Sequence, residues 1–226
     1  MRRYTRPVLA VYDAFVVGFS NSFLWKCPSR ILLDFYNQHI SADHLDVGVG
    51  TGYFLDHCRF PSPSPNLTLM DLNPNCLQRT AKRLRRYHPT CHLANVLQPI
   101  PFGVSSFSSI GLNYLLHCLP GDLTTDLPTK SAVFANLKPL LKPGGVLFGA
   151  TILGAGTKPG ILARKVSNIY NAKGIFSNSS DSAEGLRSAL ESHFSEPSIH
   201  IEVRVALFSA RTESPAAPSL VQQLSP

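Results

Sequence analysis

A glycine-rich turn constrains this chain more than any other feature of its sequence. An expected strand at His44–Val47 runs directly into Gly48, Gly50 and Gly52, which stand at alternate positions. Glycine lets the backbone turn sharply and lets a ligand approach main-chain atoms closely. The nicotinamide pattern G-x-G-x-x-G would need a glycine where Tyr53 stands, and the Lys and Ser/Thr of a P-loop are missing.

An acid at the end of the next apolar stretch indicates what the turn could bind. Asp71 follows Leu67–Met70 and stands about 20 residues beyond Gly52, the separation typical of doubly wound folds. A carboxylate at this place accepts hydrogen bonds from two ribose hydroxyls. The alternative is that Asp71 caps the helix expected to begin at Asn75. The turn and the acid together favour a nucleoside-binding site.

Alternating strand and helix patterns predict the fold class. Seven strands are expected, at His44–Val47, Leu67–Met70, Cys91–Ala94, Ser108–Leu112, Val146–Thr151, Ser198–Val203 and Val205–Ala210. Helices are expected between most of them, including Asn75–Tyr87, Leu127–Leu141 and Asp181–Phe194. This alternation predicts a doubly wound, mostly parallel α/β sheet. The last two strands have almost no connection, so they must form an antiparallel hairpin.

The basic excess of the chain has two interpretations. Lys and Arg total 21 against 14 Asp and Glu, a net charge of +7, which suits an anionic partner without demonstrating one. The stretch Arg79–His88 concentrates this charge and could contact RNA. We favour a solvated helix face, because Leu77, Ala81 and Leu84 form an apolar stripe on the opposite side.

Cysteine usage and hydropathy bear on the compartment. The five cysteines are odd in number and include no C-x-x-C pair, so we expect reduced thiols in a cytoplasmic protein. No apolar run reaches the ~18 residues of a membrane helix. The basic and apolar N-terminus imitates a signal peptide, but Asp13 interrupts it and no convincing cleavage site follows.

Several stretches occur in an order found in one enzyme family. They are Asp46–Gly52, Met70–Pro74, Ala94–Val96 with Pro101-Phe102 downstream, Ser109–His117, and Leu137–Leu147 with its Pro143-Gly144-Gly145. Over residues 8–211 the chain resembles the class I S-adenosylmethionine-dependent methyltransferases. Within that class it is most similar to ubiquinone-biosynthesis-type and fungal natural-product small-molecule enzymes. Tyr12-Asp13 and Trp25–Pro28 point towards the fungal group.

The resemblance implies a Rossmann-like, doubly wound, seven-stranded sheet with an N-terminal helical lid. Residues 1–40 would form the lid, 41–211 the S-adenosylmethionine-binding domain, and 212–226 a disordered tail. The implied cofactor is S-adenosyl-L-methionine. Its binding residues would be Tyr12, Asp46, Gly48, Val49, Gly50, Thr51, Gly52, Asp71, Leu72, Asn95, Val96 and Asn113.

Individual roles follow from the same resemblance. Asp71 would hold the ribose and Leu72 would pack on adenine. Asn95 stands where the family usually has Asp, but its amide oxygen can still accept from the adenine amino group. Asp46 would orient the glycine loop and the amino group of the cofactor, or it would cap a helix.

Fewer sequence features support the catalytic and substrate-binding candidates than support the cofactor-binding residues. His117 is the best general-base candidate, because an ordinary histidine titrates near neutrality, and Tyr114 is a weaker one. A structural role for His117 at the start of a helix is the alternative. Tyr12, Trp25 and Tyr114 are candidates for contact with the substrate, or for core packing. No metal is expected, since Leu112 and Asn113 stand where a catechol-type site would carry acids.

The predicted function is methyl transfer to a small organic molecule, in secondary metabolism. A nucleic-acid methyltransferase is the first alternative, although residues 112–115 lack the N/D-P-P-Y/F pattern of amino-methylating enzymes. The second is a member of the fold that binds the cofactor without transferring its methyl group. Nucleic acid is not a favoured partner, and the choice between monomer and homodimer stays open.

Overall fold

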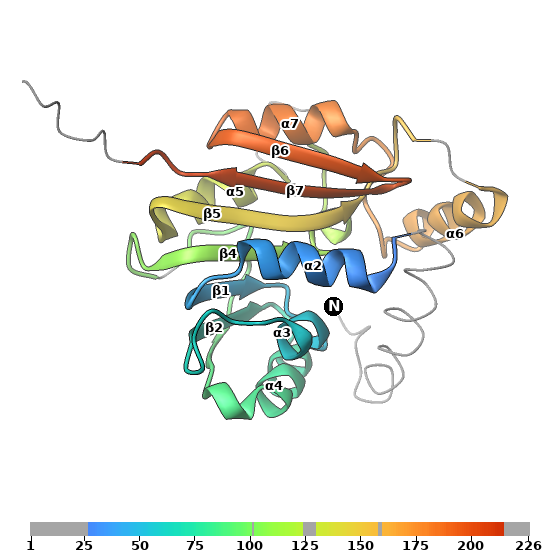
Figure 1. Ribbon diagram of the computed structural model, residues 1–226. Helices are drawn as coiled ribbons and strands as arrows, with labels where there is room; N and C mark the ends of the chain where they lie inside the picture. Colours follow the sequence, from blue (N-terminus) through green and yellow to red (C-terminus); the bar gives the residue numbers. More distant parts are fainter. Residues whose placement is uncertain (1–26, 101, 124–129, 158–159, 215–226) are drawn as a thin grey trace, which may run out of the picture.

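A seven-stranded sheet forms the centre of the computed structural model, which describes residues 27–100, 102–123, 130–157 and 160–214 (Figure 1). The strands stand in the order β3-β2-β1-β4-β5-β7-β6. They are β1 (Asp43–Val47), β2 (Asn66–Asp71), β3 (Thr90–Leu93), β4 (Phe107–Asn113), β5 (Leu141–Ile152), β6 (Ser195–Glu202) and β7 (Val205–Arg211). Strands β1 to β5 pair in parallel, and β7 is antiparallel to both β5 and β6. The predicted doubly wound sheet with its C-terminal hairpin is confirmed.

Helices cover both faces of the sheet (Figure 1). They are α2 (Ser29–His39), α3 (Tyr53–His57), α4 (Pro74–Arg83), α5 (Ala132–Leu137), α6 (Ile161–Ala172) and α7 (Ala183–Glu191). Short 3₁₀ turns occupy Arg85–Tyr87, Leu116–Cys118 and Lys138–Leu140. Helices α2, α3 and α4 pack around Phe148 on one face, and α5 and α7 pack around Phe208 on the other. Burial on both faces explains why the inner strands β2 and β5 read as largely apolar runs.

Three elements differ from the sequence prediction. The helix expected at Asn75–Tyr87 ends at Arg83, and a separate 3₁₀ turn follows it. Strand β5 begins at Leu141, because Leu141 already pairs with Phe107 of β4, and the glycine pair at 144–145 lies in an irregularity of the register before Val146 pairs with Ser109. Helix α6 was not expected. In the structure Ala163 is buried, while Ile161 and Leu162 at the start of the helix are exposed.

The ends of the described chain pack on the sheet. Leu32 and Tyr36 of α2 are buried, so this helix is part of the layer that covers the sheet. Residues 1–26, which contain Tyr12 and Trp25, lie outside the described residues. At the other end, Thr212 and Glu213 were placed in the tail. The Thr212 amide nevertheless donates to the Gly145 carbonyl, and the Glu213 carbonyl accepts from the Gly144 amide. Within the described ranges, the structure has no helix of the length and apolarity that a bilayer crossing needs.

Candidate functional site

The glycine-rich turn and Asp71 lie at the same edge of the sheet. They follow β1 and β2, which are parallel neighbours, so their carboxyl ends meet. The Gly50 amide donates a 3.4 Å hydrogen bond to Oδ2 of Asp71. The Asn73 amide donates a 2.8 Å bond to Oδ1 of the same carboxylate. Each oxygen keeps a second lone pair, so the carboxylate can still accept from a vicinal diol.

The backbone of the turn requires its glycines. Gly48, Gly50 and Gly52 have φ of 74°, 54° and 71°, a left-handed conformation that other residues rarely adopt. A Cβ at Gly52 would lie 2.6 Å from Cγ2 of Thr80. A Cβ at Gly50 would meet nothing within 4 Å. The turn is therefore closely packed against Thr80 at Gly52, and it is open where a side chain of residue 50 would point.

The electrostatic setting of Asp71 suits a ligand-binding carboxylate. Burial raises its pKa, and the bonds donated by the Asn73 and Gly50 amides partly offset this rise. The alternative role of helix cap is filled by another residue, because the side chain of Asn73 accepts from the Asn75 amide at the start of α4. Asp71 is thus not needed to begin that helix.

Asp46 lies beneath the turn and is buried. Its Oδ2 accepts a 2.6 Å hydrogen bond from the Tyr36 hydroxyl and lies 3.5 Å from Nε2 of His44. The Nδ1 atom of His44 in turn lies 2.8 Å from the hydroxyl of Ser109. A Cβ at Gly111 would come within 3.0 Å of the Asp46 carboxylate, so β4 leaves room for this group. The network connects α2, β1 and β4 just before the glycine-rich turn in the chain.

The other predicted cofactor residues follow the neighbouring strands. Asn95 comes after β3, where Leu93 pairs with Asp71, and its Oδ1 accepts from the Leu97 amide at 3.1 Å. Val96 is buried, and Leu72 and Asn113 are half-buried. The described cofactor candidates thus follow β1, β2, β3 and β4 at one edge of the sheet; among them Val49 and Thr51 are buried within the turn itself.

Tyr114 stands at a strained position directly after β4. Its φ is 55°, which is uncommon for a residue with a side chain, and such strain often occurs at functional sites. Its hydroxyl is buried beside the thiol of Cys27 and has no hydrogen-bond partner of normal geometry among the described residues. Burial, with the neighbouring thiol, raises the pKa of Tyr114 well above its usual value.

His117 is buried in a way that does not favour a base. Burial and the nearby Lys130 lower its pKa to about 3. Its Nδ1 accepts a 3.5 Å bond from the Ile152 amide, which leaves the proton of the neutral ring on Nε2. The ring packs at 4.6 Å against Phe176 and at 5.8 Å against Tyr114. The ordinary histidine pKa assumed from the sequence does not hold in this environment.

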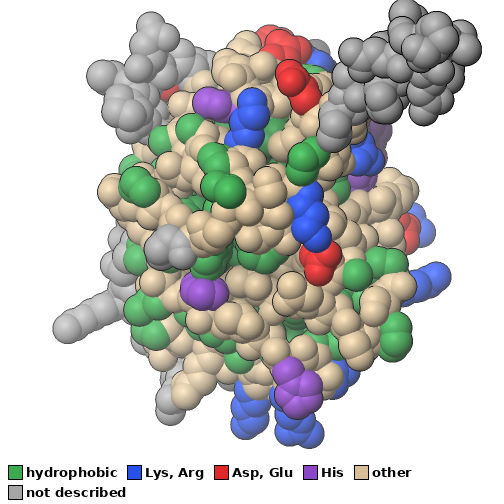
Figure 2. Space-filling view, turned by 90° about the vertical axis from the view of Figure 1, so that its left-hand side faces the viewer, with side chains coloured by type: hydrophobic (Ala, Val, Ile, Leu, Met, Phe, Trp, Pro, Cys, Tyr) green, Lys and Arg blue, Asp and Glu red, His purple; other side chains and the backbone are tan. Residues whose placement is uncertain are grey.

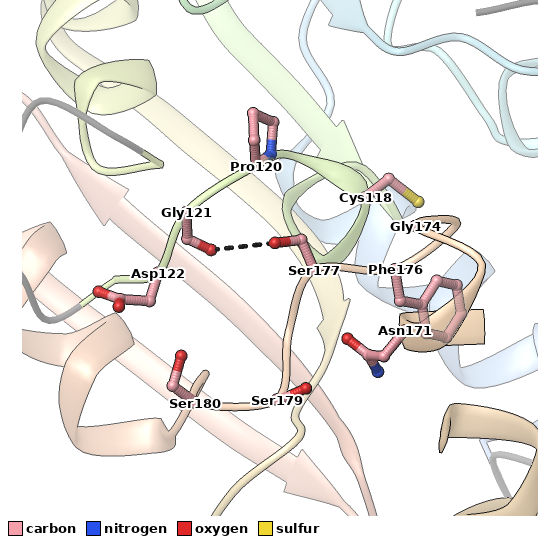
Figure 3. Close-up of a pocket in the computed structure, with 10 residues that line it drawn as sticks. All are labelled: Cys118, Pro120, Gly121, Asp122, Asn171, Gly174, Phe176, Ser177, Ser179 and Ser180. Atoms are coloured by element: carbon pink, nitrogen blue, oxygen red, sulfur yellow. Dashed lines mark hydrogen bonds between the residues drawn. The ribbon is translucent and has the colours of Figure 1, made fainter. Parts of the chain in front are cut away.

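A cavity of about 530 Å³ opens beside this aromatic group (Figure 3). One wall follows β4 and the other connects α6 to α7. The lining residues are Cys118, Pro120, Gly121, Asp122, Asn171, Gly174, Phe176, Ser177, Ser179 and Ser180. Figure 3 shows the Ser177 hydroxyl directed at the Gly121 carbonyl, where it donates a 3.4 Å bond from one wall to the other. No sequence motif marks these serines, and the sequence prediction missed them.

A buried ion pair lies beside one wall of this cavity. Lys130 and Asp181 have fully buried side chains, and Nζ of Lys130 lies 2.5 Å from Oδ2 of Asp181. The same ammonium donates to the carbonyl of Ser177, a residue of the cavity wall. Burial lowers the pKa of Lys130 and raises that of Asp181, while their mutual attraction opposes both shifts. Sequence alone gave no signal for this pair.

The basic stretch after β2 is partly engaged by its own chain. Arg86 donates a 2.6 Å bond to Oδ1 of Asp56, and Arg83 donates a 2.8 Å bond to the Thr51 carbonyl. Figure 2 shows the molecule from the side on which the parallel strands begin, opposite to the glycine-rich turn. Lys and Arg side chains gather at the bottom of this view, around α4. The described residues include no group of three or more His, Cys, Asp or Glu placed to hold a metal ion.

Comparison with known proteins gives the class. A family profile described as "Methyltransferase domain" matches residues 45–147. The chain is 39% identical over 191 residues to Demethylluteothin O-methyltransferase of Streptomyces thioluteus, covering 84% of this chain and 81% of that protein. It is 44% identical over 215 residues to Methyltransferase ctvB of Aspergillus terreus, covering 92% of each. The N-methyltransferase NodS of Bradyrhizobium japonicum, solved with S-adenosylhomocysteine, shares the fold with a TM-score of 0.56 at 19% identity over 81% of this chain and 87% of NodS.

The chain therefore belongs to the S-adenosylmethionine-dependent methyltransferases, as the sequence resemblance predicted. Its cofactor is S-adenosylmethionine. The residues present fit that molecule, because open space lies above Gly50 and the Asp71 carboxylate beside it has acceptor capacity for a ribose diol.

Proposed function

We propose that this enzyme transfers a methyl group from S-adenosylmethionine to a hydroxyl of a small organic acceptor made in secondary metabolism. The main observation in support of a methyltransferase site is the hydrogen bond from the Gly50 amide to the Asp71 carboxylate, at the carboxyl ends of β1 and β2. The hydroxyl as acceptor is supported by the O-methyltransferase relative, which is similar over most of both chains. A cavity of about 530 Å³ has the size of a small-molecule site.

The cofactor would be held by residues that follow the first four strands. Asp71 would accept from the ribose hydroxyls, the backbone of residues 48–52 would lie along the amino-acid part, and Asn95 would contact the adenine edge. Asp46 would act from below, through the turn that it supports. When bound, the cofactor supplies an electrophilic methyl group on a sulfonium sulfur. The task of the protein is to orient an acceptor towards that methyl group and to exclude water.

We assign the cavity between residues 118–122 and 171–180 to the acceptor. Its wall residue Phe176 contacts His117, which in turn contacts Tyr114 at the end of β4, so the cavity adjoins the cofactor edge. The serine hydroxyls at 177, 179 and 180 offer donors and acceptors for an oxygenated molecule. Tyr114 would contact the acceptor. His117 would position Phe176 rather than remove a proton, because its pKa lies far below neutrality.

The thiols support a reducing compartment for this enzyme. Cys27, Cys58, Cys76, Cys91 and Cys118 are all free. Disulfides form and persist in oxidising compartments and are rare in the cytoplasm. We therefore propose a cytoplasmic location.

Calorimetry with S-adenosylhomocysteine tests the cofactor site directly. We expect micromolar affinity for the wild-type protein. We expect Asp71→Ala to weaken binding by roughly 10- to 100-fold, the cost of losing hydrogen bonds to a charged group. Asp71→Asn keeps the shape of the side chain and one acceptor oxygen, so its affinity for S-adenosylhomocysteine should lie between those of the wild type and of Asp71→Ala. A wild-type protein that binds no S-adenosylhomocysteine would contradict the proposal.

The acceptor class needs a second experiment. Purified enzyme is incubated with S-adenosylmethionine and a panel of phenols, enols and amines, and the products are examined by mass spectrometry. A gain of one methyl group on phenols or enols supports the assignment. Methylation confined to amines, or to added RNA, would refute it.

A further inference from the structure

Helix α4 contacts the glycine-rich turn through two side chains that the proposed mechanism does not use. The hydroxyl of Thr80 donates a 3.2 Å hydrogen bond to the Gly50 carbonyl. The guanidinium of Arg83 donates a 2.8 Å bond to the Thr51 carbonyl. Residues three apart lie on one side of a helix, so both groups face the turn together.

Thr80 also fixes the turn by shape. It is completely buried, and its Cγ2 methyl lies where a Cβ of Gly52 would come within 2.6 Å. The hydroxyl and the methyl therefore contact two different glycines of the turn. A residue at position 80 that lacks either group would leave one of these contacts unmade.

Arg83 is the less buried of the two residues. Its side chain is 22% exposed, so it can be changed with little effect on the core. Its second neighbour, Asp56, lies 3.8 Å from Nε and is bound more closely by Arg86 at 2.6 Å. Removal of the Arg83 guanidinium would thus leave Asp56 with a partner while freeing the Thr51 carbonyl from this donor.

The turn has a physical need for such support. Glycine loses more conformational freedom on ordering than any other residue, and three of the five residues at 48–52 are glycines with positive φ. A ligand that binds a mobile turn must supply this ordering free energy, whereas a turn held in advance binds more tightly. The two bonds from α4 hold the carbonyls of two consecutive peptide units, Gly50–Thr51 and Thr51–Gly52.

We propose that Thr80 and Arg83 are positioning residues, which hold the glycine-rich turn in the conformation that binds S-adenosylmethionine. This inference rests on the assignment of the cofactor to the turn. It gives a purpose to part of the basic stretch Arg79–His88, whose charge would otherwise suggest a nucleic-acid surface.

The test measures the affinity for S-adenosylhomocysteine by calorimetry and the exchange of the Gly50–Gly52 amides by hydrogen–deuterium exchange. Thr80→Val keeps the shape and loses the hydroxyl, and Thr80→Ser keeps the hydroxyl. Arg83→Met keeps the length and loses the donors. Arg85→Met, at an exposed neighbouring position, is the matched control for loss of charge. Wild-type binding is measured first, because its absence would contradict the proposed function itself.

We expect Thr80→Val and Arg83→Met each to weaken binding of S-adenosylhomocysteine by about 3- to 10-fold and to accelerate amide exchange in the turn. The Arg85→Met control should bind S-adenosylhomocysteine as tightly as the wild type does. Thr80→Ser should restore most of the affinity. The proposal is overturned if both variants are folded and bind as tightly as the wild type. It is also overturned if Arg85→Met weakens binding as much as Arg83→Met, since net charge would then explain the loss. If Thr80→Val fails to fold, the affinity of Arg83→Met for S-adenosylhomocysteine decides the proposal.

Discussion

The backbone amide of Gly50 donates its hydrogen bond to Oδ2 of Asp71 across 3.4 Å, although 21 positions separate the two residues in the chain. Two features that are each weak in the sequence thereby meet at one point. A turn alone binds nothing in particular, and an acid after a strand is often a cap. Their contact places a diol acceptor beside an open stretch of backbone, which is the arrangement that an adenosyl group requires.

Substitution of Gly50 should separate backbone strain from loss of ligand space. At φ 54° an alanine is strained by roughly 1–2 kcal/mol, yet its methyl group meets nothing within 4 Å. We expect Gly50→Ala to lower the free energy of unfolding by about that amount and to weaken S-adenosylhomocysteine binding more than 10-fold. Gly156→Ala is the control, because Gly156 has φ 72° and equally open surroundings. Equal affinity in both variants would show that the space above Gly50 is not used.

The buried pair of Lys130 and Asp181 should show strong coupling. Lys130→Met leaves a buried carboxylate without its cation and is expected to cost roughly 3–5 kcal/mol in urea denaturation. The double variant Lys130→Met/Asp181→Leu should recover much of that loss, because neither charge is then stranded. The half-exposed pair of Lys142 and Asp43 provides the comparison, and breaking it should cost under about 1 kcal/mol. Additive losses in the buried pair would contradict this view.

Burial of His117 makes the protein sensitive to acid. The folded-state pKa of about 3 lies below the unfolded value near 6.5, so protonation favours the unfolded chain. The contribution of this residue to stability is complete above about pH 6.5 and is lost as the pH falls towards about 3. We expect His117→Asn to show a smaller loss of unfolding free energy than the wild type between about pH 7 and about pH 4.5.

The same variant tests the role of His117 in catalysis. As a positioning residue, it should change the rate of methyl transfer with no change in the acid limb of the pH–rate profile. Disappearance of a limb near pH 6–7 in His117→Asn would identify the imidazole as the base after all.

The hydroxyl of Tyr114 should matter for catalysis and not for stability. It is buried without a hydrogen-bond partner of normal geometry among the described residues. Tyr114→Phe should therefore leave the free energy of unfolding unchanged or raise it by up to about 1 kcal/mol. If the hydroxyl contacts the acceptor, methyl transfer slows while affinity for S-adenosylhomocysteine stays the same. An unchanged rate would remove Tyr114 from the site.

Local patterns predicted the inner strands of the sheet because these are buried on both faces. Leu67–Met70 and Val146–Thr151 read as apolar runs between turn residues, and both lie inside strands of the structure. The mostly parallel course of the sheet followed from the alternation of strands and helices, whereas the order of the strands came from the structure alone. Predicted strand ends were off by up to a few residues, most of all at β5, where Pro143 and the glycine pair looked like a turn.

Contacts made across the fold could not be predicted in this way. Arg83 was interpreted as part of a solvated face, because nothing in its own helix shows that its guanidinium meets the Thr51 carbonyl. The pKa of His117 depends on burial under Phe176 and on the nearness of Lys130, neither of which is visible in the sequence. Asp71 was left with a possible capping role until the structure placed Asn73 at that position.

The antiparallel course of β7 decides where the described chain ends. Arg211 pairs with Val146 at the amino end of the parallel strands, and Thr212 and Glu213 continue along residues 142–145. Ser214 therefore lies beside Gly144, at the end of the strands opposite to the one that carries Gly50 and Asp71. An affinity tag or a biosensor linkage fused behind Ser214 would hold the enzyme with its nucleoside-binding edge turned to the solution, ready for the titrations described above.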